Sequence, residues 1–280
     1  MFTYLKKGRF LPFLLTCALL GACEISGPKT AQDWFEVTWA GLAGSDTMNF
    51  QGRASLLRDN QIQEEGNIAF SGQLQNHQML TLKAEPSQAG RGHNLAMAGL
   101  GKGAELATFQ LKGRKWVMLD RTERSASPLP RTLNRINPLA QLEEIHDTKA
   151  KTIRLESGAA RGTKVLRIEL APDEAKALLR RQLTEEMDNV LADWKLRAAG
   201  LALSRPELDA LTRQVEDTWS KGRKEMTHKL DIAQVSSVYH LTIDNKSGLP
   251  KRLTSSSTVT YPANSGVNKP EVYMADCHFQ

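Results

Sequence analysis

The chain has 280 residues, of which 40% are hydrophobic and 24% charged, and its formal net charge is +6 at pH 7. This hydrophobic content is sufficient for a packed core and argues against a wholly disordered chain. The basic residues are interspersed with acidic ones, which argues against a nucleic-acid-binding protein.

The N-terminal segment, residues 1–22, has the composition of a secretory signal. A positively charged start precedes an apolar run over residues 10–20, which is too short to span a bilayer stably. Small residues then lead directly to Cys23. The order of charge, apolar run and four-residue box resembles the precursors of bacterial lipoproteins. The basic residues are Lys6, Lys7 and Arg9, and the box residues before the cysteine are Leu20, Gly21 and Ala22.

This resemblance implies that the bond before Cys23 is cut and that Cys23 carries acyl chains, so that residues 23–33 form a lipidated N-terminus and tether. Several chains, at about 0.8 kcal/mol per buried methylene, make a permanent membrane anchor. In this family an aspartate directly after the cysteine would favour retention in the inner membrane; the residue here is Glu24, so that retention signal is absent. The implied location is extracytoplasmic, on the cell membrane of a one-membrane bacterium or the outer membrane of a two-membrane one. The alternative is an ordinary signal peptide cut elsewhere, with Cys17 and Cys23 as mere apolar residues.

The first half of the remaining chain alternates with the period of β-strands. A helix is expected over residues 30–43, and turns are expected at Asp59-Asn60 and Asn76-His77. Together these patterns predict a meander of antiparallel strands. The expected strands are 48–56, 68–74, 80–84, 93–98, 104–111 and 115–121.

The second half adds helices between strands. Asn137 is expected to cap a short helix that begins with Pro138. Apolar residues at three- and four-residue spacing predict a long helix from Pro172, and the box Ser204 to Glu207 begins a second helix. The two would form a helical hairpin over residues 172–228. Further strands are expected at 151–156, 163–170, 229–244, 251–261 and 271–280.

Cys277 would be the remaining thiol once Cys23 is lipidated, so no intrachain disulfide is expected. It alternates with Tyr273, Ala275 and Phe279 along the last strand. The alternation predicts a buried strand residue rather than a reactive thiol.

Two motifs resemble the LolA-like superfamily of lipoprotein carriers and lipid-binding lipoproteins. One is Asn137-Pro138-Leu139-x-x-Leu142, and the other is the late hairpin from Leu241 to Pro250 with Gly248-Leu249-Pro250 at its end. The resemblance implies an α+β fold, in which a curved antiparallel sheet, an incomplete β-barrel, packs on helices around an apolar cavity for acyl chains. Residues 34–280 would form a single domain, with the helical hairpin inserted before the last strands.

The sequence contains few patterns that are typical of enzymes. The six histidines include no HExxH pair, and there is no Gly-x-Ser-x-Gly elbow or zinc-type cysteine cluster. We therefore expect no catalytic residues, no metal and no cofactor.

The sequence thus favours a non-catalytic lipoprotein that is held on a membrane and binds a lipid, another hydrophobic ligand or an envelope protein. The first alternative is a structural or regulatory surface lipoprotein with a closed core that acts by protein contact, and an envelope hydrolase comes third. The candidate ligand-facing residues are large apolar side chains of the hairpin and the first strands. They are Trp194, Trp219, Leu183, Leu211, Phe50 and Phe70.

Overall fold

The computed structural model describes residues 28, 30–86, 105–113, 115–121, 133, 135–198, 200–262 and 269–280. The bounds of the helices are α1 Ala31–Ala43, α3 Pro138–Asp147, α4 Pro172–Ala198 and α5 Arg205–Ile232. The bounds of the strands are β1 Thr47–Arg58, β2 Gln61–Gln75, β3 Met79–Pro86, β4 Glu105–Lys112, β5 Lys115–Arg121, β6 Lys151–Leu155, β7 Thr163–Leu170, β8 Gln234–Asp244, β9 Pro250–Thr260 and β10 Glu271–Phe279.

All ten of these strands form one antiparallel sheet in the order β5-β4-β3-β2-β1-β10-β9-β8-β7-β6. The first five strands are a meander, as the sequence predicts, and β1 pairs with β10 in the middle of the sheet. Strands β5 and β6 are the two edges, so the described sheet is open rather than closed into a barrel. This arrangement, with helices packed on it, confirms the predicted α+β fold class.

Tight turns occur where the sequence predicts them. Asp59 and Asn60, between β1 and β2, both have positive φ, at 57° and 59°. Two consecutive residues in this region make the turn whose twist matches an antiparallel hairpin, and Asp and Asn tolerate it better than most residues. Asn76 and His77 repeat the conformation between β2 and β3, with φ of 51° and 58°.

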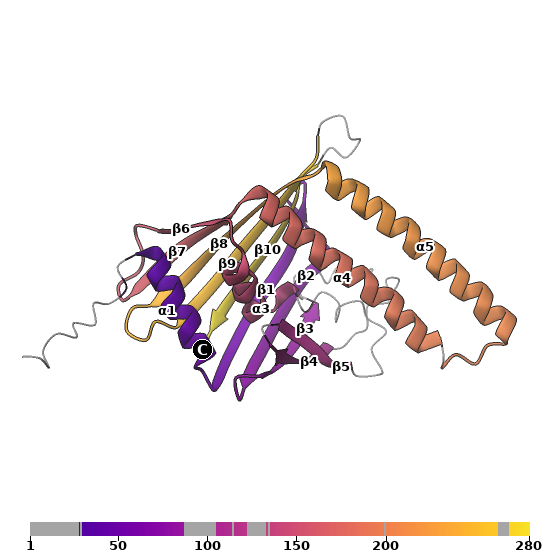
Figure 1. Cartoon of the computed structure of the whole chain (residues 1–280), viewed down its shortest axis with the longest axis horizontal. Coiled ribbons are helices and arrows are strands. Elements are labelled where there is room, and N and C mark those ends of the chain that lie inside the picture. The colour runs from indigo at the N-terminus through magenta and orange to yellow at the C-terminus, as the bar shows by residue number, and fades with distance from the viewer. Residues whose placement is uncertain are drawn as a thin grey trace, which may run out of the picture.

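Three of the described helices lie on one face of the sheet. Figure 1 shows α1 near β6 and β7, α3 over the middle strands and α4 crossing the sheet obliquely, while α5 runs back beside α4 on the side away from the sheet. The core lies between this face and the helices, and Phe35, Phe109 and Leu142 are among its fully buried side chains. In α5, by contrast, only Leu230 is buried.

Local capping explains where two of these helices begin. The Thr30 hydroxyl accepts a hydrogen bond from the Asp33 N–H at 3.0 Å, and the Asp33 carboxylate accepts one from the Thr30 N–H at 2.9 Å. Asn137 caps α3 by accepting from the Leu139 N–H at 3.0 Å, with Pro138 as the first helical residue. Such caps satisfy backbone donors that have no partner within the helix.

Some predicted boundaries differ from the structure. Helix α5 continues to Ile232, so residues 229–232, expected to begin a strand, are helical and β8 begins at Gln234. The reason is that the apolar stripe of α5 continues to Leu230, which is 3% exposed. Helix α1 begins at Ala31, inside the expected tether of 23–33. The expected strand 93–98 lies outside the described residues.

Cys277 is buried on the inner face of β10, as its alternation predicts, and its burial raises the pKa of the thiol. In a variant with Cys17 and Cys23 replaced by serine, we expect Cys277 to react slowly with a thiol reagent while the protein is folded, because burial suppresses both access and thiolate formation. In denaturant it should react at the rate of a free thiol. Absorbance of the released chromophore gives both rates. Equal rates would contradict burial of this strand.

Candidate ligand cavity between the sheet and helix α4

A cavity of about 560 Å³ lies between the inner face of the sheet and α4. Its walls come from β1, β2, β8, β9, β10, α3 with the residues just before it, α4 and one residue of α5. Most of the lining side chains are apolar or aromatic. The apolar and aromatic lining residues are Leu56, Ile68, Ile136, Leu179, Leu183, Leu230, Tyr239, Val259, Tyr261 and Tyr273.

Small side chains in the middle of the sheet leave this space open. Ser255 and Ser257 are consecutive inner-facing residues of β9 and line the cavity. Gly66 of β2 also lines it, and a Cβ there would lie 2.5 Å from the Cβ of Leu56, so only glycine fits. Larger residues at these positions would fill the gap beneath α4, as they do elsewhere in the core.

Helix α4 is held over the cavity by polar contacts at both sides. The Lys176 ammonium donates to the backbone oxygens of Asp231 and Ala233, at 2.7 and 3.0 Å, where α5 joins β8. On the other side, the Gln182 amide donates to the Glu144 carboxylate of α3 at 2.9 Å. These contacts fix the distance between α4 and the sheet, so the cavity does not depend on apolar packing alone.

Two carboxyl groups that contact side chains of the cavity wall have raised pKa values. Burial raises the pKa of Glu144 to about 7, although Arg181, 3.5 Å away, and the hydrogen bond from Gln182 act in the opposite direction. Burial also raises the pKa of Glu186 on α4, against the opposing charge of Arg135. Desolvation therefore outweighs the nearby cations at both sites.

One end of the cavity carries a cation against an aromatic ring. The guanidinium carbon of Arg135 lies 4.9 Å from the ring centroid of Tyr273, and both residues line the cavity. Burial raises the pKa of Tyr273 to about 12, so its hydroxyl keeps its proton at neutral pH. The cavity is thus apolar over most of its surface and offers hydrogen-bond donors at this end.

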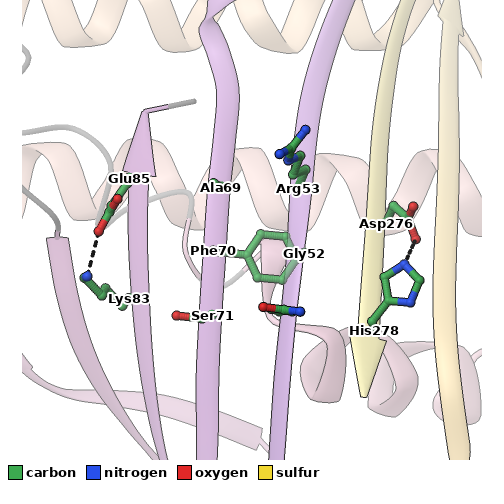
Figure 2. A pocket seen from close by; sticks show the side chains of 10 residues that line it. Gly52, Arg53, Ala69, Phe70, Ser71, Lys83, Glu85, Asp276 and His278 are labelled. Carbon is green, nitrogen blue, oxygen red and sulfur yellow. Dashed lines mark ion pairs between the residues drawn. The ribbon is translucent and has the colours of Figure 1, made fainter. Parts of the chain in front are cut away.

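A second hollow, of about 580 Å³, lies on the outer face of the sheet. Figure 2 shows it over β3, β2, β1 and β10, with ion pairs joining Lys83 to Glu85 and His278 to Asp276. Asp276 also accepts two hydrogen bonds from Arg252, each at 2.7 Å. Because these charges pair with one another and none of the described helices packs on this face, we assign the candidate ligand site to the inner cavity.

The structure separates the six candidate residues predicted from sequence. Leu183 lines the inner cavity, and the other five lie outside its wall. Phe50 and Phe70 pack against each other in the core, with ring centroids 6.4 Å apart. Sequence periodicity locates the inner face of a strand, but it does not say which inner-facing residues lie beside an open space.

Three of the five belong to the hairpin. Leu211 is half-buried on α5, a helix with little contact to the sheet. Trp219 faces α4 rather than the sheet, since its indole donates to the Met187 carbonyl at 2.8 Å and Arg223 stacks on it at 5.1 Å. Trp194 is half-buried on the distal part of α4.

Sequence reasoning missed Arg135, Tyr273, Ser255 and Ser257. A sequence pattern could have identified the two serines, because small polar residues at alternate inner positions of β9 break an otherwise apolar face. No sequence pattern identified Arg135, since its contact with Tyr273 joins residues that are far apart in the sequence.

Within the described parts of the chain, no group of three or more His, Cys, Asp or Glu side chains is placed to hold a metal. Among those same residues, no helix combines the length and the hydropathy needed to cross a bilayer. Leu20, Gly21, Ala22 and Cys23 lie outside the described residues.

No protein-family model matches the chain. No curated protein sequence matches it. Among solved structures, it is similar to LprF from Mycobacterium bovis, with a TM-score of 0.34 and 8% identity over 89% of this chain and 91% of that one. It is also similar to a LolA superfamily protein from Nitrosomonas europaea, with a TM-score of 0.26 and 10% identity over 90% and 93% of the two chains. At these scores and identities, neither similarity transfers a ligand or an activity.

Proposed function

We propose that this protein is a membrane-anchored, extracytoplasmic lipoprotein that binds an apolar acyl ligand in the inner cavity and performs no chemistry on it. The observation that carries the proposal is the cavity itself. Its volume of about 560 Å³ lies within the usual range of ligand sites, roughly 300 to 1,000 Å³. The alternative of a closed core acting by protein contact would leave no such volume between sheet and helix.

The lining supports an acyl ligand rather than a polar one. Leu179 and Leu183 on α4 face Ile68 and Val259 on the sheet across the cavity. Burying a ligand's methylenes against such a surface contributes about 0.8 kcal/mol each. Membrane anchoring is supported by the order of charge, apolar run and box that leads to Cys23.

Two matched substitutions on the hairpin test the proposal. In the full chain carrying Cys23→Ser, which lacks a lipid of its own, Leu183→Trp should weaken binding of the neutral probe N-phenyl-1-naphthylamine at least about tenfold, or ~1.4 kcal/mol. The reason is that the larger side chain occupies the ligand's space. Leu211→Trp makes the same exchange outside the cavity and should leave the affinity unchanged. Probe fluorescence gives the affinities, and circular dichroism checks that both variants are folded.

Equal probe affinities for the two folded variants would place any bound ligand elsewhere. Loss of stability in Leu183→Trp, with no probe bound by the parent chain, would favour the closed-core alternative.

A further inference from the structure

Two hydrogen-bond donors at one end of the cavity have no hydrogen-bond partner among the described residues. They are the Nε–H of Arg135, just before α3, and the hydroxyl of Tyr273, on β10, and both atoms are buried. Both residues line the cavity. A buried donor without a partner destabilises a folded protein by about 1–3 kcal/mol, so native proteins keep few of them. Two at the same end of one cavity indicate that the missing acceptor belongs to a ligand.

The two donors are held in place before any ligand arrives. The Arg135 guanidinium lies over the Tyr273 ring, 4.9 Å from its centroid. The Gln141 amide donates to the Arg135 backbone oxygen at 2.7 Å, which fixes the segment that carries the guanidinium. A ligand therefore loses little affinity to the ordering of these side chains.

The charge of Arg135 is already balanced. Oε1 of Glu186 lies 3.4 Å from Arg135 Nε, without the geometry of a hydrogen bond. A ligand carboxylate at this end would bring a second negative charge beside Glu186 in a desolvated site, where like charges repel strongly. A neutral carbonyl oxygen accepts hydrogen bonds without this repulsion.

We infer that Arg135, Tyr273 and Glu186 select the polar end of the ligand, and that this end is a neutral acyl ester whose carbonyl oxygens accept hydrogen bonds from the Arg135 Nε–H and the Tyr273 hydroxyl. The inference rests on the proposed function and names the ligand class. Arg135 and Tyr273 supply the donors, and Glu186 excludes free fatty acids by its charge.

Competition between two lipids that have the same acyl chain and different polar ends tests this selection. In the full chain carrying Cys23→Ser, 1-monooleoylglycerol should displace N-phenyl-1-naphthylamine at a concentration at least about fivefold lower than oleic acid does at pH 8, the scale of one hydrogen bond or one repelled charge. Glu186→Gln should remove this preference, because the repelling charge is gone while the donors remain.

Tyr273→Phe separates recognition from folding. It should weaken binding of the ester about fivefold, the scale of one hydrogen bond, while the thermal unfolding midpoint stays the same or rises, because the variant lacks a buried hydroxyl without a partner. Tyr261→Phe is the matched control: this tyrosine also lines the cavity, but its hydroxyl is not among the buried atoms without a partner. It should weaken ester binding less than Tyr273→Phe does.

Oleic acid binding as tightly as the ester in the parent chain would overturn the inference, as would an unchanged ester affinity in Tyr273→Phe. Either result leaves acyl binding in the cavity intact. A parent chain that binds neither lipid nor the probe would instead overturn the proposed function, and the inference with it.

Discussion

Replacing Cys23 with serine is expected to abolish acyl labelling and to release the protein from the membrane fraction. The resemblance to lipoprotein precursors implies that the segment ending in Leu20-Gly21-Ala22 would present the Cys23 thiol for acylation. A serine hydroxyl at this position supplies no thioether, so every acyl chain of the anchor is lost. At about 0.8 kcal/mol per buried methylene, this removes the main free energy of membrane attachment.

The measurement is metabolic labelling with an alkyne-bearing fatty acid, followed by separation of membrane and soluble fractions. Cys17→Ser is the matched control, because it changes the other cysteine of the same segment and should leave labelling intact. Full labelling of the Cys23→Ser protein would show that the lipid, if any, is attached elsewhere.

Replacing Gly52 with alanine is expected to lower the free energy of unfolding by about 3 kcal/mol or more, the upper end of overpacking effects. A Cβ on Gly52 would lie 2.3 Å from the backbone oxygen of Asp276 and 2.5 Å from Cζ of Phe70. The first of these atoms belongs to the neighbouring strand β10, so it moves only if the central pairing of the sheet moves. Urea unfolding followed by circular dichroism measures the loss.

Gly222→Ala provides the opposite case on α5. A Cβ at Gly222 would make only an ordinary contact with Cε of Met187, at 3.6 Å. Alanine in a helix interior is favoured over glycine by about 1 kcal/mol, so this variant should be more stable than the parent. A similar loss of stability in both variants would contradict the close approach of strands at Gly52.

The elements of the fold could be predicted from sequence because local chemistry determines them. Asp59 and Asn60 form the tight turn that their residue types favour, and Asn137 caps α3. The late hairpin motif also has a local cause. Asp244 accepts hydrogen bonds from the N–H groups of Lys246 and Ser247, and the Asp244 pKa is lowered by its hydrogen bond with Lys251 and by these backbone bonds. Gly248 follows with a φ of 71°, which favours glycine.

The cavity could not be predicted in the same way, because it depends on which residues face each other across layers. Leu183 and Leu211 each belong to the apolar stripe of their own helix, yet of the two only Leu183 lines the cavity. The difference arises because α4 lies against the sheet while α5 packs on α4. Likewise, Arg135 contacts Tyr273 although the two residues are far apart in the sequence. Periodicity gives the face of an element but not its partner.

The central pairing of β1 with β10 has a consequence for the order in which this molecule is assembled. Within each half of the sheet, β1 to β5 and β6 to β10, every strand pairs with the strand that precedes or follows it in the sequence. At the centre, by contrast, β1 pairs with β10, and the paired residues Arg58 and Glu271 are 213 residues apart. Long-range pairs of this kind form late, after local hairpins, because of the loop entropy they cost. The strand that carries Tyr273 also follows all the other described strands in the sequence. The inner cavity, which β1 and β10 line together, is therefore incomplete until β10 has joined the two halves of the sheet.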